Sequence, residues 1–139
     1  MPIKYEKAPD IEREAREIVN QLGWNWVDLN HVAFIRSYGS QSRGTIARCH
    51  ALGKAMQLGM GRTKGFYLIE VISKRFDKMS PEEQTKVIIH ELMHIPKTFG
   101  GGFKHHNVVN EKNVKTIYEH YCKLKERSLE KEDNKTRWF

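Results

Sequence analysis

The spacing of apolar residues predicts an amphipathic helix near the start of the chain. Between residues 11 and 22, apolar side chains recur at helical intervals, at Ile11, Ala15, Ile18 and Leu22. Asp10 is of a type that caps helix N-termini, and Gly23 is of the type that ends helices in the left-handed conformation. We therefore expect a helix that starts at Asp10, ends before Gly23 and buries one face.

Three later segments have strand-like patterns. In residues 24–38, apolar side chains occupy both sets of alternate positions, which is typical of a strand covered on both faces of its sheet. Residues 45–58 fit either a helix or a strand, and we interpret them as a strand because Gly53 and the alternation around Cys49 disfavour a helix. Residues 66–72, rich in aromatic and β-branched side chains, give the strongest strand signal.

Two further helices are predicted in the second half of the chain. Ser80, Pro81 and Glu83 form a capping box with proline at the first helical position, and the apolar run that follows ends at Pro96. A glycine-rich loop leads to a last helix that we expect to begin near Asn107. Residues 130–139 are mostly charged, and we expect them to form a frayed tail.

These elements fit one small domain of mixed class. The chain has 139 residues, 39% of them hydrophobic, which suffices for one core spanning residues 1–139. We expect an α+β fold, in which a short sheet packs against the N-terminal helix, a central helix and the C-terminal helix.

Charge and cysteine content narrow the class of protein. There are 24 Lys and Arg against 17 Asp and Glu, a net charge of +7, and no long apolar run, which excludes a membrane-embedded protein. The first residues are polar and lack a leader pattern, so we expect a cytoplasmic protein, and a monomer. Cys49 and Cys122 lie far apart and outside any CxxC pattern, which argues against a disulfide framework.

The central helix carries the sequence His90-Glu-Leu-Met-His94, an HExxH motif. Residues four apart lie on the same helix face, so both imidazoles reach one cation. Glu91 comes from the same turn without sharing that face, where a general base is needed. A buried His-Glu-His cluster without a metal would be costly to desolvate, so we interpret the motif as a metal site.

A catalytic zinc site needs a third protein ligand and one open position. The position ten residues after His90 is Gly100, so the long metzincin form of the motif is absent. The spacing leaves several candidates open, namely His105 and His106 after the glycine-rich loop, and His120, Glu111 and Glu119 in the last helix.

The block from residue 87 to residue 106, together with Glu70 and the Ser80-Pro-Glu-Glu helix start, resembles the phage and archaeal metallopeptidases. These are small zincin-like proteins, similar in outline to the SprT-like peptidases. The resemblance covers roughly residues 10–125. It implies a zinc-dependent peptidase fold, and alignment on Gly102-Phe-Lys implies that His106 is the third ligand and His105 a variable position.

The expected function is therefore peptide-bond hydrolysis. Zn²⁺ held by His90, His94 and His106 would polarise the carbonyl and activate water, while Glu91 transfers the proton to the leaving amine. We expect the substrate to be a peptide or protein that adds as a strand to the edge of segment 66–72.

Two alternatives belong to other classes. A DNA-associated, SprT-like protease would bind nucleic acid through basic residues concentrated before the motif, which are Arg36, Arg43, Arg48, Lys54, Arg62, Lys64, Lys74 and Arg75. A non-catalytic binding module would use zinc for folding alone, with a fourth ligand such as His105 beside His106.

Overall fold

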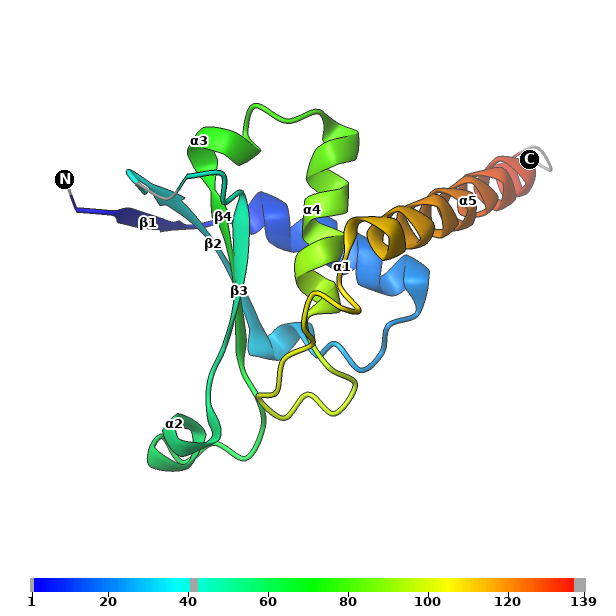
Figure 1. The fold of residues 1–139 in the computed structure, drawn as a ribbon. Helices are drawn as coiled ribbons and strands as arrows, with labels where there is room; N and C mark the ends of the chain where they lie inside the picture. The colour runs from blue at the N-terminus through cyan, green and yellow to red at the C-terminus, as the bar shows by residue number, and fades with distance from the viewer. Residues whose placement is uncertain (1, 41–42, 137–139) are drawn as a thin grey trace.

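The computed structural model describes residues 2–40 and 43–136, the last four of these by their backbone alone. Figure 1 shows a sheet with helices gathered on one of its faces. In chain order the elements are β1 (Lys4–Lys7), α1 (Pro9–Leu22), the 3-10 turn η1 (Leu29–His31), β2 (Val32–Tyr38), β3 (Ala47–Ala51), α2 (Lys54–Gly59), β4 (Tyr67–Ile72), α3 (Ser73–Phe76), α4 (Pro81–Met93) and α5 (Glu111–Thr136).

The four strands form one mixed sheet in the order β1-β2-β4-β3. The central strands β2 and β4 are parallel, with Phe34 opposite Ile69, and both side chains are buried. Strands β1 and β3 pair antiparallel to them at the two edges. Side chains at every second position of a strand point to the same face of the sheet, and the core lies on one of these faces.

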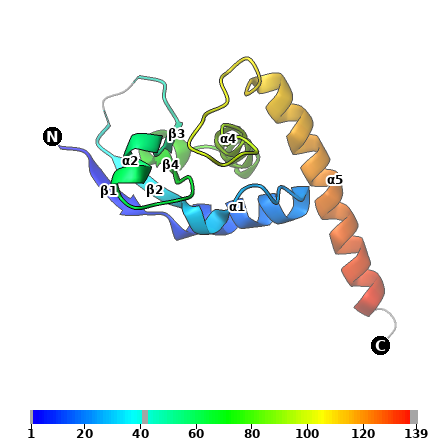
Figure 2. The ribbon, with the colours of Figure 1, turned by 90° about the horizontal axis from the view of Figure 1, so that it is seen from below.

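Helices α1 and α4 lie against that face, and α5 runs along their outer side and beyond them (Figures 1 and 2). The apolar faces of the helices meet the sheet in one core that includes fully buried Ile18, Ile69, Ile88, Ile89 and Leu92. The predicted α+β architecture, with a short sheet against an N-terminal, a central and a C-terminal helix, is confirmed.

The first helix forms as predicted, with a different start. It begins at Pro9, with Ala8 at the N-cap, so Asp10 lies in the first turn and is not the cap. The N–H at the first helical position has no acceptor within the helix, so proline, which lacks an N–H, loses no hydrogen bond there. Its fixed φ also suits the helix. Gly23 ends the helix at φ 67°, as the sequence predicts.

Two of the predicted strands are shorter than expected. Residues 24–31 form turns and the 3-10 turn η1, in which the Asp28 side chain accepts from Asn30 N–H, so strand β2 begins only at Val32. Segment 45–58 divides into strand β3 and helix α2, with Gly53 at the helix N-cap. The glycine there separates the two elements, so the prediction of a single strand over residues 45–58 is wrong.

The chain's start contains a short strand that the periodicity did not predict. β1 pairs with β2 over Lys4–Lys7, and all of its side chains are exposed. An edge strand with no buried face has no hydrophobic alternation by which a sequence pattern reveals it.

The second half of the chain follows the prediction closely. Helix α4 starts after Ser80, whose Oγ accepts from the backbone N–H of Glu83 at 3.2 Å. Helix α5 begins at Glu111 and not near Asn107, because residues 107–110 form turns. Residues 130–136 of the expected charged tail continue α5, and residues 137–139 lie outside the described part of the chain.

The sheet order corrects one functional prediction. Segment 66–72 forms β4, which is paired on both sides, so it offers no edge to a substrate. The edge strand next to the helices is β3. Among the helices of the described residues, none combines the length and hydropathy needed to cross a membrane.

Candidate metal centre

The structure brings His90, His94 and His106 together. Their ligand atoms all lie within 4.8 Å of one another, although His106 is twelve residues beyond His94 in the chain. The ring centroids are 5.2 Å apart for His90 and His94, 5.6 Å for His90 and His106, and 5.0 Å for His94 and His106. Three imidazoles converge on one point without further rearrangement of the backbone.

Helix α4 supplies two of these rings. His90 lies in its last turn, and His94 is the residue that caps its C-terminus, with helical dihedral angles of φ −68° and ψ −19°. Because His94 keeps the helical conformation, its side chain still lies one turn beyond that of His90 on the same face. The helix is anchored in the core by its buried face, which carries Ile88, Ile89 and Leu92.

Neighbours of His94 fix the orientation of its ring. The Nδ1 atom lies 2.5 Å from the backbone oxygen of Lys104, which as a carbonyl only accepts, so Nδ1 carries the proton and donates. The Phe103 ring stacks on the imidazole, with centroids 4.5 Å apart. This contact leaves the Nε2 lone pair of His94 available as a metal ligand, the arrangement found around metal-bound histidines.

The loop between α4 and α5 carries His106 and is tied to distant parts of the chain. The Tyr67 hydroxyl donates to the Gly102 carbonyl at 2.8 Å and accepts from the Gly101 N–H at 3.1 Å. The Gln57 amide of α2 donates to the Gly100 carbonyl at 3.3 Å, and Lys104 N–H donates to the His94 carbonyl at 2.9 Å. Side chains of β4 and α2 thus hold the loop over the end of α4.

Burial and the mutual proximity of the histidines set their charge state. Desolvation, together with His94 and His106 nearby, lowers the pKa of His90 to about 4. Desolvation also lowers the pKa of His94. Both rings are neutral at pH 7, which is the protonation state that a metal ligand needs.

Glu91 lies beside the histidine cluster and has no hydrogen bond on one oxygen. Its side chain is buried, its Oε2 atom has no partner in the described structure, and its Oε1 lies 4.0 Å from His90 Nε2. Burial raises the pKa of Glu91 to about 7. A buried carboxylate oxygen without a partner is costly unless something else approaches it, and a substrate water or a leaving amine would do so.

The other candidate ligands lie apart from the cluster. The exposed His105 is not among its members, and His120 and Glu119 are exposed on α5. Glu111 lines a neighbouring cavity but is also outside the cluster. Of the candidates for the third ligand, only His106 is brought to His90 and His94 within the described part of the chain.

No pattern in the sequence identifies the residues that support the site. The Tyr67 hydroxyl, the Gln57 amide and the Lys104 carbonyl act through contacts between segments far apart in the chain. Tyr67 and Gln57 could not be distinguished by pattern from an ordinary strand tyrosine and an ordinary helix glutamine.

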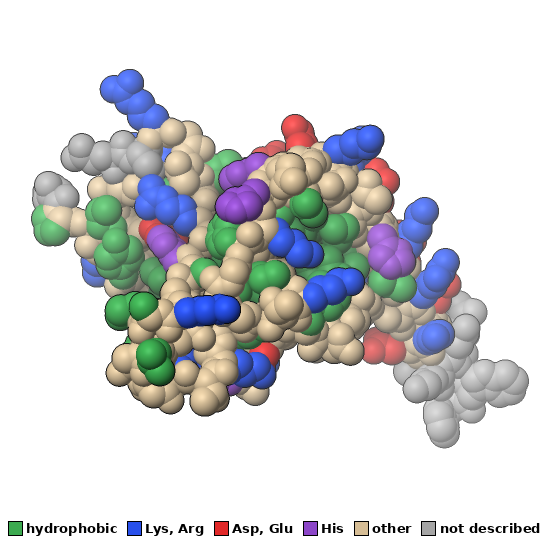
Figure 3. Space-filling view, turned by 60° about the horizontal axis from the view of Figure 1, so that its bottom comes forward, with side chains coloured by type: hydrophobic (Ala, Val, Ile, Leu, Met, Phe, Trp, Pro, Cys, Tyr) green, Lys and Arg blue, Asp and Glu red, His purple; other side chains and the backbone are tan. Residues whose placement is uncertain are grey.

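Several of the basic residues predicted as a nucleic-acid surface are engaged inside the protein. Arg36 pairs with Asp10 and Asp77, and Lys64 pairs with Asp28. On the face drawn in Figure 3, Lys and Arg side chains are spread over the surface and do not gather in one patch. Binding of nucleic acid stays a prediction.

The donor set fits zinc better than calcium or magnesium. Imidazole nitrogens are ligands that zinc prefers, whereas calcium and magnesium require oxygen. In the described residues the cluster has three members, which matches a catalytic site with one position left for water or substrate, and not a closed four-ligand structural site.

Comparisons with known proteins agree with this geometry. A search of the curated proteins gave no significant match, and a search of the solved structures gave none either. A family model described as "putative phage metallopeptidase" matches residues 3–123, which include both strands at the sheet centre, α4, the loop and His106. The chain belongs to this phage metallopeptidase family.

Proposed function

We propose that the protein is a zinc-dependent peptidase in which His90, His94 and His106 hold the metal and Glu91 is the general base. The observation that carries this proposal is the convergence of three imidazoles, within 4.8 Å of one another, beside a buried carboxylate. When bound there, zinc supplies a Lewis acid for the carbonyl and lowers the pKa of coordinated water to about 7.

Glu91 is suited to proton transfer in this site. Its carboxylate is buried, and its Oε1 lies 4.0 Å from His90 Nε2, so it stands beside the position that the metal and its water would take. It takes the proton from the attacking water and passes it to the nitrogen of the leaving amine. The water oxygen bonds to the carbonyl carbon and the peptide C–N bond breaks as the nitrogen is protonated, giving a carboxylic acid and an amine, and the acid then transfers its proton to the amine.

Strand β3 is the element that positions an extended substrate. It is an edge strand, and its residues Ala47, Cys49 and Ala51 pack toward the core on the helix side of the sheet. His90 and Ala47 border the same cavity, so the free edge of β3 runs beside the metal centre. An exposed sheet edge binds a peptide by adding it as a further strand.

The hydrogen-bond pattern identifies which residues of β3 face that free edge. Ile72 N–H donates to the Ile46 carbonyl, and Leu52 N–H donates to the Phe66 carbonyl. In an antiparallel pair, hydrogen-bonded and non-bonded positions alternate, so Arg48 and His50 also bond to β4. The backbone N–H and C=O groups that remain for a substrate are those of Ala47, Cys49 and Ala51.

The decisive experiment is the substitution Glu91→Gln, assayed on a mixture of unstructured synthetic peptides with zinc supplied. We expect zinc binding to remain near one ion per chain and the cleavage rate to fall by about 10²–10⁴-fold, because the amide cannot accept the proton. Cleavage by this variant at the parental rate would contradict the role of Glu91.

A matched control is Glu119→Gln, which makes the same chemical change at an exposed position of α5. We expect both zinc content and cleavage to match those of the parent. Loss of zinc in this control would return Glu119 to the list of ligands. The cytoplasmic location and the monomeric state are further expectations of the same proposal.

A further inference from the structure

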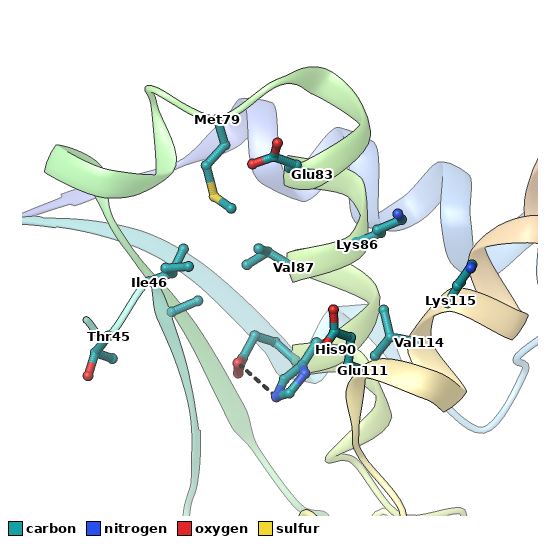
Figure 4. A pocket seen from close by; sticks show the side chains of 12 residues that line it. Thr45, Ile46, Met79, Glu83, Lys86, Val87, His90, Glu111, Val114 and Lys115 are labelled. Atoms are coloured by element: carbon teal, nitrogen blue, oxygen red, sulfur yellow. Dashed lines mark ion pairs between the residues drawn. The ribbon is translucent and has the colours of Figure 1, made fainter.

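A cavity opens directly beside the metal centre. Its volume is about 480 Å³, and it lies between α4, the first turn of α5 and the chain that leads into β3. Figure 4 shows side chains from these elements pointing toward one another around it, with His90 at one end and Met79 at the other. A volume of this size accommodates a large side chain with room to spare.

The walls and the mouth of the cavity differ in character. The walls are apolar and at least partly buried, and they consist of Ile46, Ala47, Met79, Val87 and Val114. The charged residues Glu83, Glu111 and Lys115 are exposed, so they lie at the mouth and not within it. The cavity is therefore an apolar recess with a polar rim, which is the usual composition of a specificity pocket.

The cavity is continuous with the proposed catalytic groups. His90 and Glu91 are lining residues, and Val87 precedes His90 by one turn of α4. Ala47, whose backbone faces the free edge of β3, lines it as well. A peptide that lies along β3 with its scissile bond at Glu91 thus places a neighbouring side chain at the entrance.

We propose that this cavity is the specificity pocket of the enzyme, and that it receives a large apolar side chain, aromatic or long aliphatic, directly next to the cleaved bond. The inference rests on the proposed peptidase function and adds the substrate class. Burial of such a side chain among the five apolar wall residues removes it from water, which stabilises the bound peptide.

The charges near the cavity do not select a charged side chain. The lining residues include two carboxylates at the mouth, Glu83 and Glu111, and two lysines, Lys86 and Lys115, which balance them. Lys86 is also engaged, because it pairs with Glu82 at 3.2 Å and lies over the Tyr118 ring at 5.1 Å. A lysine or aspartate of a substrate would lose its hydration among the apolar walls, and the one buried carboxylate that lines the cavity, Glu91, is the proposed general base and not a partner for a substrate lysine.

Direct binding tests the pocket without any need for turnover. The probes are the N-acetyl amides of phenylalanine, leucine, lysine and aspartate, titrated into the zinc-supplied protein while methyl signals are followed by NMR. We expect the phenylalanine and leucine amides to shift the methyl signals of Ile46, Val87 and Val114, and the charged amides to leave them unchanged. Equal shifts from all four amides, or none from any, would overturn the proposal.

Narrowing the pocket sharpens the test. Val87→Phe places a ring among the walls, and we expect it to weaken binding of the phenylalanine amide roughly 10-fold while leaving zinc content unchanged. The matched control Val108→Phe makes the same change at an exposed position outside this cavity. A cooperative thermal transition will show whether the Val87→Phe variant is folded. If the folded variant binds the phenylalanine amide as tightly as the parent does, the pocket proposal is overturned.

Cleavage of a peptide library separates this inference from the proposed function. If the library is cleaved, we expect a large apolar residue on one side of the scissile bond to be favoured about 10-fold over alanine. Cleavage with no preference on either side leaves the peptidase intact and removes the pocket. If nothing is cleaved while the phenylalanine amide still shifts the pocket methyls, the peptidase function fails and the binding pocket stands.

Discussion

The two segments that supply the histidines are built in different ways. Helix α4 holds His90 and His94 on a capped helix, so local bonds settle its backbone, and its buried residues Ile88, Ile89 and Leu92 fix it in the core. The loop of residues 94–110 holds His106 through bonds to other elements. It also contains Phe99 at φ 49°, a strained backbone angle for a residue with a side chain.

This difference indicates where the metal site is robust and where it is sensitive. Two of the proposed ligands, His90 and His94, remain close together as long as α4 is helical, whereas His106 depends on several contacts that must form together. The strain at Phe99 is offset because its ring is buried against Tyr67, with centroids 5.0 Å apart. Substitutions that act on helix α4 alone, or on the loop of residues 94–110 alone, measure how much each contributes to metal binding.

The largest expected effect comes from the ligands themselves. His94→Ala and His106→Ala should each lower zinc content from about one ion per chain to near zero, whereas His105→Ala should retain it. Only His94→Ala should also destabilise the metal-free protein, by about 1–3 kcal/mol, because the Lys104 carbonyl then loses its buried donor. His106 is exposed, so its loss should cost less than about 0.5 kcal/mol.

Metal analysis and thermal unfolding in chelator check this prediction. Equal destabilisation by His94→Ala and His106→Ala would mean that the bond to Lys104 contributes nothing to the loop.

Gly101→Ala should cause the next largest loss of zinc affinity, because it displaces the loop and leaves helix α4 unchanged. Gly101 has φ +97°, and an added Cβ would lie 2.5 Å from Gln57 Nε2 and 2.8 Å from the Leu52 carbonyl oxygen. We expect zinc affinity to fall by about 10–100-fold, since the displaced loop no longer orients its ligand. Competition with a chromophoric chelator measures the change.

Gly102→Ala is the matched control for that substitution. Its Cβ would meet nothing nearer than Pro96 Cγ at 3.8 Å, an ordinary contact. A loss of zinc affinity as large as in Gly101→Ala would show that any side chain in the loop disturbs the site.

Tyr67→Phe should have a smaller effect in the same direction. It removes one hydroxyl that both donates to Gly102 and accepts from Gly101, while keeping the buried ring in place. Leaving these backbone groups without a partner costs about 1–3 kcal/mol, and we expect zinc affinity to fall roughly 10-fold. Zinc affinity equal to that of the parent would remove Tyr67 from the support of the site.

Ser80→Ala should give the smallest effect on the metal. The Oγ of Ser80 caps the N-terminus of α4, far along the helix from the histidines, so its loss should lower the free energy of unfolding by about 1 kcal/mol. Zinc affinity should stay within twofold of the parent's, since the last turn of α4 is held by its own core contacts. Chemical denaturation and the chelator assay together test both halves of the prediction.

Sequence patterns predicted the elements whose signals are local. The capping box at Ser80 set the start of α4, and Gly23 set the end of α1, because each acts through bonds to residues within one turn. The HExxH spacing likewise placed His90 and His94 on one face of α4. Two of the errors in element type fell on residues 24–31 and 45–58, where apolar residues belong to turns and a short helix that pack on other elements.

The sequence by itself determined the class of fold, the helix that carries the motif and the placing of His90 and His94 on one face of it, since helical geometry relates residues four apart without reference to the rest of the chain. Resemblance to the metallopeptidase family selected His106 over His105, and the fold then brought His106 to the other two rings. Only the tertiary structure decided that β3 is the edge strand, that Tyr67 and Gln57 anchor the loop, and that an apolar cavity adjoins His90. These features depend on contacts between segments distant in sequence, and no local pattern encodes such contacts.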